Sequence, residues 1–453
     1  MSKSADAQRM EKIVSLCKRR GFIFQSSEIY GGLNGCWDYG PLGVELKRNL
    51  KNYWWRVMVH ERDDVVGMDG SILMNRAVWK ASGHEDTFSD PMVDCRSCKA
   101  RLRLDQLIDK KGVKQCPNCG GQDLTAPRAF NLMFKTFIGA SEDESSVTYL
   151  RPETAQSIFV QFKNILEISR KKLPFGIAQI GKAFRNEINP RNFTFRSREF
   201  EQMELEYFCR SEQGMELLEY WKEERLKFYE NIGISREKLH VLTVPDDARA
   251  FYSKGTYDIE YEFPFGRQEL EGVAYRTDYD LSQHQRASGK SLEYFDEETK
   301  QKFIPHVVEP SAGVDRTVLA LICEAYTEDQ APDEKGKMET RTVLRFHPRM
   351  APIKCAVFPL LKNKEQLVAK AKEIVDLLRP HMSIFYDESG AIGRRYRRQD
   401  EIGTPFGVTV DFETLGEKDA ELRDTVTLRE RDSMKQERFK ISELIQLLSA
   451  RIA

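Results

Sequence analysis

The sequence has 453 residues, of which 40% are apolar and 31% are charged, a composition typical of soluble globular proteins. Lysine and arginine total 70 against 71 for aspartate and glutamate, so no overall positive field is present to attract nucleic acid, DNA included. The length exceeds one ordinary hydrophobic core, no apolar run reaches the ~20 residues of a membrane span, and the polar start lacks a signal peptide. We therefore expect a cytoplasmic protein of two or three domains.

The first strong signal is an amphipathic helix over residues 44–59, which follows the sequence "YGPLG". Glycine and proline set a sharp entry to a helix. Apolar side chains recur at helical spacing along the segment, and these are Leu46, Leu50, Tyr53, Trp54 and Val57. The pattern predicts a helix with one buried face.

Two C-x-x-C pairs come next, Cys95 with Cys98 and Cys116 with Cys119. Nine cysteines are an odd number, which argues against a disulfide framework, as does a reducing compartment. The spacing is typical of a zinc site with four thiolate ligands, which leaves no open coordination position. The sequence therefore predicts a structural zinc ion. The alternative is four unrelated reduced cysteines.

Residues 184–208, "FRNEINPRNFTFRSREFEQMELEYF", carry a dense set of arginines, glutamates and aromatic residues. The turn formers of "NPRN" predict a hairpin, with Arg185 and Glu187 on one face of the first strand. On the second strand, alternation separates two sets of side chains, which are Gln202, Glu204 and Glu206 against Met203, Leu205 and Tyr207. The charged face either forms solvated ion pairs or binds a ligand with phosphates, a purine and an amine.

Two further segments carry the same residue types. "RPETAQ" places Arg151 and Glu153 on either side of a proline. "EPSAGVDR" leads from Glu309 and Ser311 into a helix over 313–326 that is apolar almost all round and should be buried. The start of this helix, together with Arg316, suits an anion such as a terminal phosphate, although a solvated arginine is the simpler interpretation for Arg316 alone.

From residue 345 to 453 strands and helices alternate, which predicts a separate α/β domain. The polar segment 327–340 before it reads as a linker. A helix is expected over 364–378, with Leu367, Ala371, Ile374 and Leu378 on one face. The run "RRYRR" at 394–398 suits phosphate contact and base stacking, or else a solvated basic face.

Several of these segments together resemble a known family. The regions at 37–60, 184–208 and 309–326 resemble motifs 1, 2 and 3 of class II aminoacyl-tRNA synthetases. More narrowly, "IYGGLNGCWDYGPLG", "ILMNRAVWKASGH", "FNLMFKT", "LRPETAQ", "EFEQMELE" and "GRRYRRQDEIGTPF" resemble the dimeric glycyl-tRNA synthetases, in order and over almost the whole chain.

The resemblance implies an α+β catalytic domain on an antiparallel sheet over 1–340, with a zinc-knuckle insertion at 90–126. A C-terminal α/β anticodon-binding domain would follow at 345–453. It further implies glycine, ATP with Mg²⁺, and tRNA(Gly) as substrates and partners, and a homodimer. One departure is Arg191 in the motif 2 turn, where relatives often carry a smaller residue.

The resemblance also carries over residue by residue. Arg185 and Arg316 would be the catalytic cations. The ATP-binding positions are Arg185, Asn186, Glu187, Phe195, Arg196, Ser197, Arg198, Glu199, Phe200, Glu269, Leu270, Gly313, Val314, Asp315 and Arg316. The glycine-binding positions are Arg103, Glu153, Phe200, Glu201, Gln202, Met203, Glu204, Glu309, Pro310, Ser311, Ala312 and Gly313. Cys95, Cys98, Cys116 and Cys119 are the metal ligands.

Two other functions fit the same scaffold. One is a non-catalytic subunit that binds nucleic acid, which would be free to lose its ATP ligands. The combined presence of Arg185, Glu187, Phe200, Glu269 and Arg316 argues against it. The other is a class II synthetase for a different amino acid, against which the carboxylate-rich pocket argues.

Overall fold

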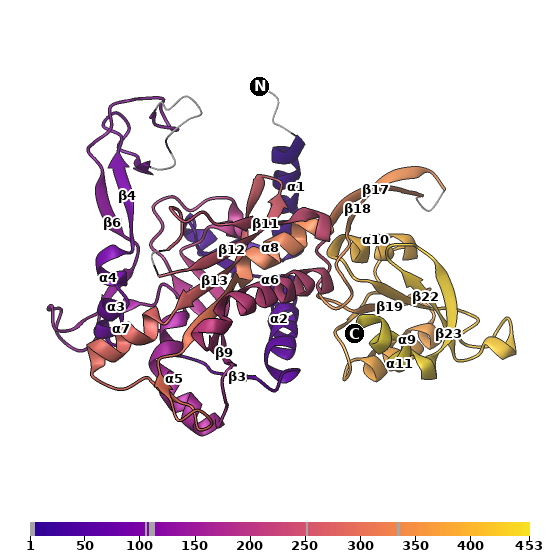
Figure 1. Cartoon of the computed structure of the whole chain (residues 1–453). Coiled ribbons are helices and arrows are strands. Elements are labelled where there is room, and N and C mark those ends of the chain that lie inside the picture. The colour runs from indigo at the N-terminus through magenta and orange to yellow at the C-terminus, as the bar shows by residue number, and fades with distance from the viewer. Residues whose placement is uncertain (1–4, 105–106, 108–113, 251, 333–335) are drawn as a thin grey trace.

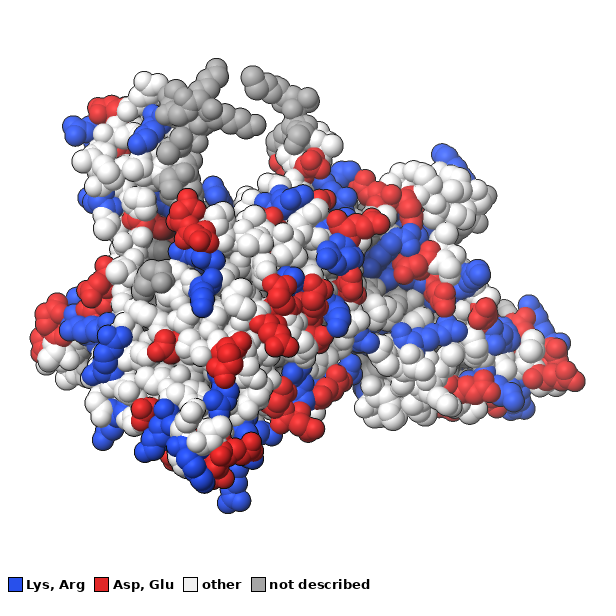
Figure 2. Space-filling view, in the orientation of Figure 1, with Lys and Arg blue, Asp and Glu red and all other residues white. Residues whose placement is uncertain are grey.

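The computed structural model describes residues 5–104, 107, 114–250, 252–332 and 336–453. It consists of a large N-terminal part, an arm that projects from it, and a smaller C-terminal domain on the opposite side (Figure 1). Acidic and basic residues are interspersed over the face in Figure 2, in keeping with the near-zero net charge. Among the described helices, none is long and apolar enough to cross a membrane.

A seven-stranded sheet forms the centre of the described N-terminal part. Neighbouring strands run antiparallel except for the last pair, which is parallel. The strands in spatial order are β11 (Leu239–Thr243), β12 (Gly255–Phe263), β13 (Gly266–Thr277), β16 (His306–Gly313), β10 (Glu199–Cys209), β9 (Phe175–Phe184) and β3 (Val65–Gly67). The predicted antiparallel core is therefore confirmed.

Helices cover both faces of this sheet. The larger core lies on the face packed against α1 (Ala5–Arg20), α2 (Pro41–Trp55), α6 (Gly214–Asn231) and α8 (Val314–Ala325). A second core joins the other face to α5 (Ala155–Ser169) and α7 (Tyr279–Ser288). Along β10 the odd-numbered Met203, Leu205 and Tyr207 enter the first core, as predicted, and Phe208 enters the second.

Both predicted helices of this part are confirmed. α2 begins at Pro41 and buries Leu46, Leu50, Tyr53 and Trp54, and its last turn continues as a π-helical segment, Arg56–His60. α8 has ten buried residues among its twelve. Short strand pairs also occur, β1 (Ile23–Gln25) with β2 (Trp37–Tyr39), β7 (Phe134–Phe137) with β8 (Val147–Leu150), and β14 (Tyr294–Phe295) with β15 (Lys302–Phe303).

The predicted hairpin exists, but its strands lie elsewhere. β9 ends at Phe184 and β10 begins at Glu199, so Arg185 and Glu187 belong to the connection and not to a strand. The backbone turns away from the sheet because the N–H of Asn186 donates to the carbonyl of Leu132 at 2.7 Å, and that of Glu187 to the carbonyl of Arg185 at 2.7 Å. The prediction that they share a strand face was therefore wrong.

The projecting arm is a small sheet, with β4 (Ser89–Asp94) between β5 (Arg101–Arg103) and β6 (Arg128–Asn131). The helices α3 (Arg76–Ala81) and α4 (His84–Thr87) lie at its base (Figure 1). This is the predicted insertion at 90–126, within which residues 105–106 and 108–113 lie outside the described residues. Its strands extend the insertion on both sides.

The C-terminal domain is the predicted α/β unit. Its described strands follow the order β20 (Ile384–Tyr386), β19 (Cys355–Pro359), β21 (Phe406–Val410), β22 (Thr425–Glu430) and β23 (Gln436–Lys440). The helices are α9 (Glu365–Leu378), α10 (Ile392–Ile402) and α11 (Leu444–Ile452). On α9 the four predicted residues Leu367, Ala371, Ile374 and Leu378 are buried. Strand β23 was not predicted.

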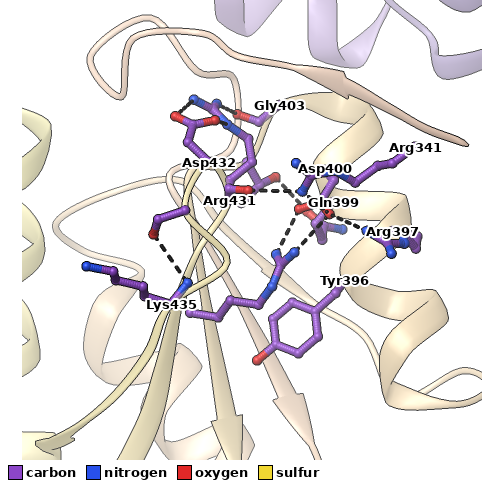
Figure 3. A network of polar contacts seen from close by, with 12 residues as sticks. Arg341, Tyr396, Arg397, Gln399, Asp400, Gly403, Arg431, Asp432 and Lys435 are labelled. Atoms are coloured by element: carbon purple, nitrogen blue, oxygen red, sulfur yellow. Dashed lines mark hydrogen bonds and ion pairs between the residues drawn. The ribbon is translucent and has the colours of Figure 1, made fainter. Parts of the chain in front are cut away.

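The segment expected to be a linker is a hairpin of β17 (Tyr326–Pro332) and β18 (Met338–Leu344), so that prediction was wrong. Its Arg341 is 1% exposed and donates to Asp400 on α10 at 3.1 Å and to Asp329 (Figure 3). Phe346, Met350 and Ala351 belong to the N-terminal core, whereas the C-terminal core begins at Cys355. The two domains therefore meet near residue 353.

Candidate active site

A pocket of about 370 Å³ opens on the face of the sheet that carries the even-numbered residues of β10. Most of the predicted ATP-binding side chains and part of the predicted glycine set line it together. These are Arg185, Glu187, Phe195, Arg196, Ser197, Phe200, Gln202, Glu269, Leu270, Glu309, Ser311, Gly313, Asp315 and Arg316. Segments separated by more than a hundred residues thus converge on one cavity.

Four arginines line this pocket, and they are Arg185, Arg196, Arg249 and Arg316. Arg185 donates from Nε to the carbonyl of Pro152 at 3.0 Å, and its guanidinium carbon lies 5.3 Å from the ring centre of Phe200. Arg316, in the first turn of α8, packs 4.6 Å from the ring centre of Phe195 and pairs with Glu269 at 3.3 Å. Burial lowers the pKa of Arg196, with further lowering by the nearby charges of Arg103, Arg191 and Arg316. Such a concentration of positive charge suits a polyphosphate.

Glu187 is held beside these arginines by its backbone. Arg198 donates from Nε and Nη2 to the carbonyl of Glu187 at 3.2 and 3.0 Å, so its guanidinium positions the loop instead of facing the pocket. The carboxylate of Glu187 pairs with Arg196 at 3.6 Å. Its buried Oε2 has no hydrogen-bond partner among the described residues, which leaves an acceptor for an amino group of a ligand.

Carboxylates lie together at the other end of the site. Glu204 accepts from the hydroxyls of Thr154 and, at 2.8 Å, Ser311. Glu153 pairs with His84 at 3.2 Å. Burial alone would raise the pKa of Glu153, but the charge of His84 and its hydrogen bond hold it well below the ordinary value. This end of the site suits a cationic amine.

Arg276 on β13 also lies at this end of the site, and no local sequence pattern predicted it. It donates to Glu309 at 2.6 Å and to both carboxylate oxygens of Asp280 at 2.8 and 2.9 Å. The guanidinium is 3% exposed and also lies 4.3 Å from the ring centre of Tyr252. Arg276 therefore fixes the orientation of Glu309 from behind.

Other predicted positions lie outside the pocket. Met203 and Ala312 are buried in the N-terminal core, because alternation turns them to the opposite face of the sheet, and Val314 is buried in the same core as the first residue of α8. Glu201 points the same way and pairs with Lys47 and Lys51 of α2, while Glu199 pairs with Lys182 at the surface. The remaining positions that do not line it are Arg103, Glu153, Asn186, Arg198, Glu204 and Pro310.

Two carboxylates of the pocket fit a divalent cation. Glu269 and Asp258 both line it beside Arg316. Burial raises the pKa of Asp258 to about 6, and the neighbouring charge of Glu269 adds to the effect. A hard cation such as Mg²⁺ relieves this repulsion and prefers carboxylate and phosphate oxygens. Asp258 was not among the predicted residues.

The four predicted metal ligands converge in the arm. The Sγ atoms of Cys95, Cys98, Cys116 and Cys119 all lie within 4.8 Å of one another, and the pairs Cys95–Cys119 and Cys98–Cys116 are separated by 3.6 and 3.5 Å. Four sulfurs around one zinc at ~2.3 Å would be about 3.8 Å apart.

The run "RRYRR" lies on α10, where the helix sends its side chains in different directions. Arg395 is 2% exposed and donates to the carbonyls of Pro359 and Gly390, and Tyr396 bonds Thr409 at 2.6 Å. Arg398 pairs with Asp387 at 2.6 Å. Most of the run therefore stabilises the domain, and Tyr396 is not placed to stack on a base. Arg394 is the exposed member.

Comparison with known proteins agrees with this geometry. Residues 134–326 match the tRNA synthetase class II core domain (G, H, P, S and T), and residues 354–451 match the anticodon binding domain. The chain thus belongs to the class II aminoacyl-tRNA synthetases. It is 54% identical to a glycine–tRNA ligase of Treponema denticola, covering 98% of this chain and 97% of the relative.

Relatives from other organisms give the same result. The glycine–tRNA ligase of Thermobifida fusca is 52% identical over 99% of both chains, and that of Borreliella burgdorferi is 52% identical over 98% of both. Within its class the protein belongs to the glycine–tRNA ligase family. The resemblance drawn from the sequence motifs is confirmed.

Proposed function

We propose that the protein activates glycine with ATP and transfers the glycyl group to the 3′ end of tRNA(Gly). The observation that carries this proposal is the pocket itself, in which four arginines and an aromatic platform lie beside a group of carboxylates. ATP and an amino acid need this combination of charges. The protein's membership of the glycine–tRNA ligase family gives independent support.

In the first step a carboxylate oxygen of glycine attacks the α-phosphorus of ATP, and pyrophosphate leaves. Arg185 would hold the α-phosphate and the glycine carboxylate, Arg316 the γ-phosphate, and Glu187 the adenine amino group against Phe200. Mg²⁺, held at Asp258 and Glu269, would neutralise phosphate charge. Positioning and charge neutralisation can carry such a reaction without a catalytic base.

In the second step a 3′-terminal hydroxyl of tRNA(Gly) attacks the glycyl carbonyl, and AMP leaves with its phosphate. The C-terminal domain, which matches an anticodon binding domain, would hold the other end of the tRNA. The N-terminal part and this domain are joined through Arg341 and Asp400. Both ends of one tRNA would therefore contact a single connected framework.

Selectivity for glycine follows from the crowded carboxylate end. Glu153, Glu204 and Glu309 would surround the glycine ammonium, and a side chain on Cα would meet them. Inserting a methyl group into a packed site costs ~1 to 3 kcal/mol, which is about 5- to 150-fold in selectivity.

The test is ATP–pyrophosphate exchange with glycine, alanine, serine and proline offered separately. Exchange is expected with glycine, and exchange with alanine should be slower by about 5- to 150-fold. Exchange with another amino acid but not glycine would assign the protein to a different specificity, and the absence of exchange with all four would favour a non-catalytic subunit.

We further propose that zinc fills the thiol quartet and holds the arm so that Arg103 stays near Arg196. Arg103 on β5 pairs with Asp90 of β4 at 2.6 Å, and a small core that includes Cys95 and Cys116 packs behind these strands. Cys116→Ser is expected to abolish stoichiometric zinc in metal analysis and to lower glycine-dependent exchange roughly 10- to 100-fold, because small displacements in a site are costly.

Cys36→Ser is the matched control, because Cys36 lies outside the quartet and is only half-buried. It should retain both zinc and exchange activity. If Cys116→Ser lost zinc but kept a folded arm and normal exchange, the positioning role of the metal would be wrong.

A homodimer in the cytosol completes the proposal. It rests on the resemblance at motif 1, around α2, and on the thiol quartet, which a reducing compartment preserves. Light scattering measures the mass in solution, which distinguishes a monomer of the 52.5 kDa chain from a dimer.

A further inference from the structure

Glu206 lies directly behind the carboxylate end of the site, and the chemistry proposed so far does not use it. Its side chain points to the same face of β10 as Glu204, is 0% exposed, and does not line the pocket. Neither carboxylate oxygen has a hydrogen-bond partner among the described residues. A buried ionised carboxylate without a partner is strongly unfavourable.

The groups that face Glu206 do not supply a free positive charge. One carboxylate oxygen each from Glu204, Glu206 and Glu309 lies within 4.8 Å of the other two. Among the described residues, the arginine whose charge acts on Glu206 is Arg276 on β13, and it directs its bonds to Glu309 and to Asp280 on α7. Four acidic groups thus surround one guanidinium.

A proton resolves this imbalance. Burial raises the pKa of Glu206 well above its ordinary value, and the charge of Glu309 adds to the effect. Like-charged residues on adjacent strands repel each other, whereas a carboxylic acid can donate to a neighbouring carboxylate. Both oxygens of Glu204 already accept hydrogen bonds, so Glu309 is the better acceptor.

We propose that Glu206 is a positioning residue that stays a neutral carboxylic acid and donates a hydrogen bond to Glu309. Arg276 would hold one side of Glu309 and Glu206 the other, so that the carboxylate facing the substrate keeps one orientation toward the glycine ammonium. This inference rests on the proposed function. It adds a residue that touches no substrate but sets the affinity for glycine.

Two variants separate a neutral donor from a charged group. Glu206→Gln keeps the shape and an N–H donor, and Glu206→Met keeps the length but cannot donate. In ATP–pyrophosphate exchange, Glu206→Gln should stay within about threefold of the wild type in kcat/KM for glycine. Glu206→Met should raise the KM for glycine about 10- to 100-fold, with the KM for ATP little changed, because a hydrogen bond to a charged group is lost.

Stability against pH gives a second readout. A glutamate with a raised pKa in the folded state favours the folded state below its ordinary pKa of about 4.5, and this stabilisation is lost as pH rises toward the raised value. The Glu206→Gln variant has no carboxyl group to ionise, so it does not lose stability in this way. Its melting temperature relative to the wild type should therefore increase as the pH rises above about 4.5.

The results would overturn the inference in three ways. If Glu206→Gln impaired glycine use as severely as Glu206→Met, the negative charge would be required, for an ammonium or a metal ion. If Glu206→Met behaved like the wild type, Glu206 would position nothing. A melting difference for Glu206→Gln that did not change with pH would exclude the bound proton. An inactive wild type would instead contradict the proposed function and leave the melting test to decide on the proton.

Discussion

Arg185→Ala is expected to lower glycine-dependent ATP–pyrophosphate exchange about 100- to 1000-fold, the effect typical of removing one charged group that stabilises a transition state. Arg185 is half-buried at the entrance to the connection after β9, and its guanidinium is fixed between Phe88 and Phe200, 5.4 and 5.3 Å from their ring centres. A cation held so firmly loses little entropy when a phosphate binds. The decrease should appear mainly in kcat.

Arg191→Ala is the matched control, an arginine in the same connection that is exposed and does not line the pocket. In exchange measured without tRNA, its effect should stay below about threefold. A similarly small effect of Arg185→Ala would mean that the arginines of this segment form only a solvated lattice of ion pairs.

Asp400→Ala is expected to destabilise the protein by about 3 to 5 kcal/mol, the range found when one partner of a buried ion pair is removed. Asp400 is 1% exposed and accepts from Arg429 at 2.8 Å and from Arg341 at 3.1 Å, with Arg397 3.6 Å away (Figure 3). Its removal leaves Arg429 without a carboxylate partner among the described residues, whereas Arg341 keeps Asp329 and Arg397 keeps Glu339 at 3.8 Å. Denaturation in urea measures the loss.

Asp376→Ala gives the comparison, because Asp376 on α9 pairs with Arg379 at the surface, where the side chains are 73% and 65% exposed. It should cost at most about 0.5 kcal/mol. A similar small loss for Asp400→Ala would show that the arginines find water or other acceptors once the aspartate is gone.

Strong local patterns predicted the parts of the molecule that a single segment encodes. The buried faces of α2, α8 and α9 follow from apolar residues at helical spacing, and the thiol quartet follows from its two C-x-x-C pairs. Family motifs then located most residues of the pocket. These features need no knowledge of how distant segments pack.

The features that sequence reasoning missed depend on such packing. Arg276 and Asp280 are four residues apart in an ordinary-looking segment, and only the approach of β16 brings Glu309 to them. The sequence of the β17–β18 hairpin has the polar composition of a linker, because Arg341 is buried through ion pairs and not through apolar contacts. The carbonyl of Leu132 determines where the chain leaves the sheet after Phe184, and no local sequence pattern indicates this contact.

The β17–β18 hairpin also belongs to the segment that connects the pocket to the C-terminal domain. α8 starts at Val314 beside the pocket, spans twelve residues or about 18 Å, and ends at Ala325, where β17 begins. β18 then brings Arg341 to Asp400. The described parts of this segment therefore connect the pocket to the C-terminal domain. On the proposed function, this segment links the place of adenylate formation to the domain that holds the anticodon end of the tRNA.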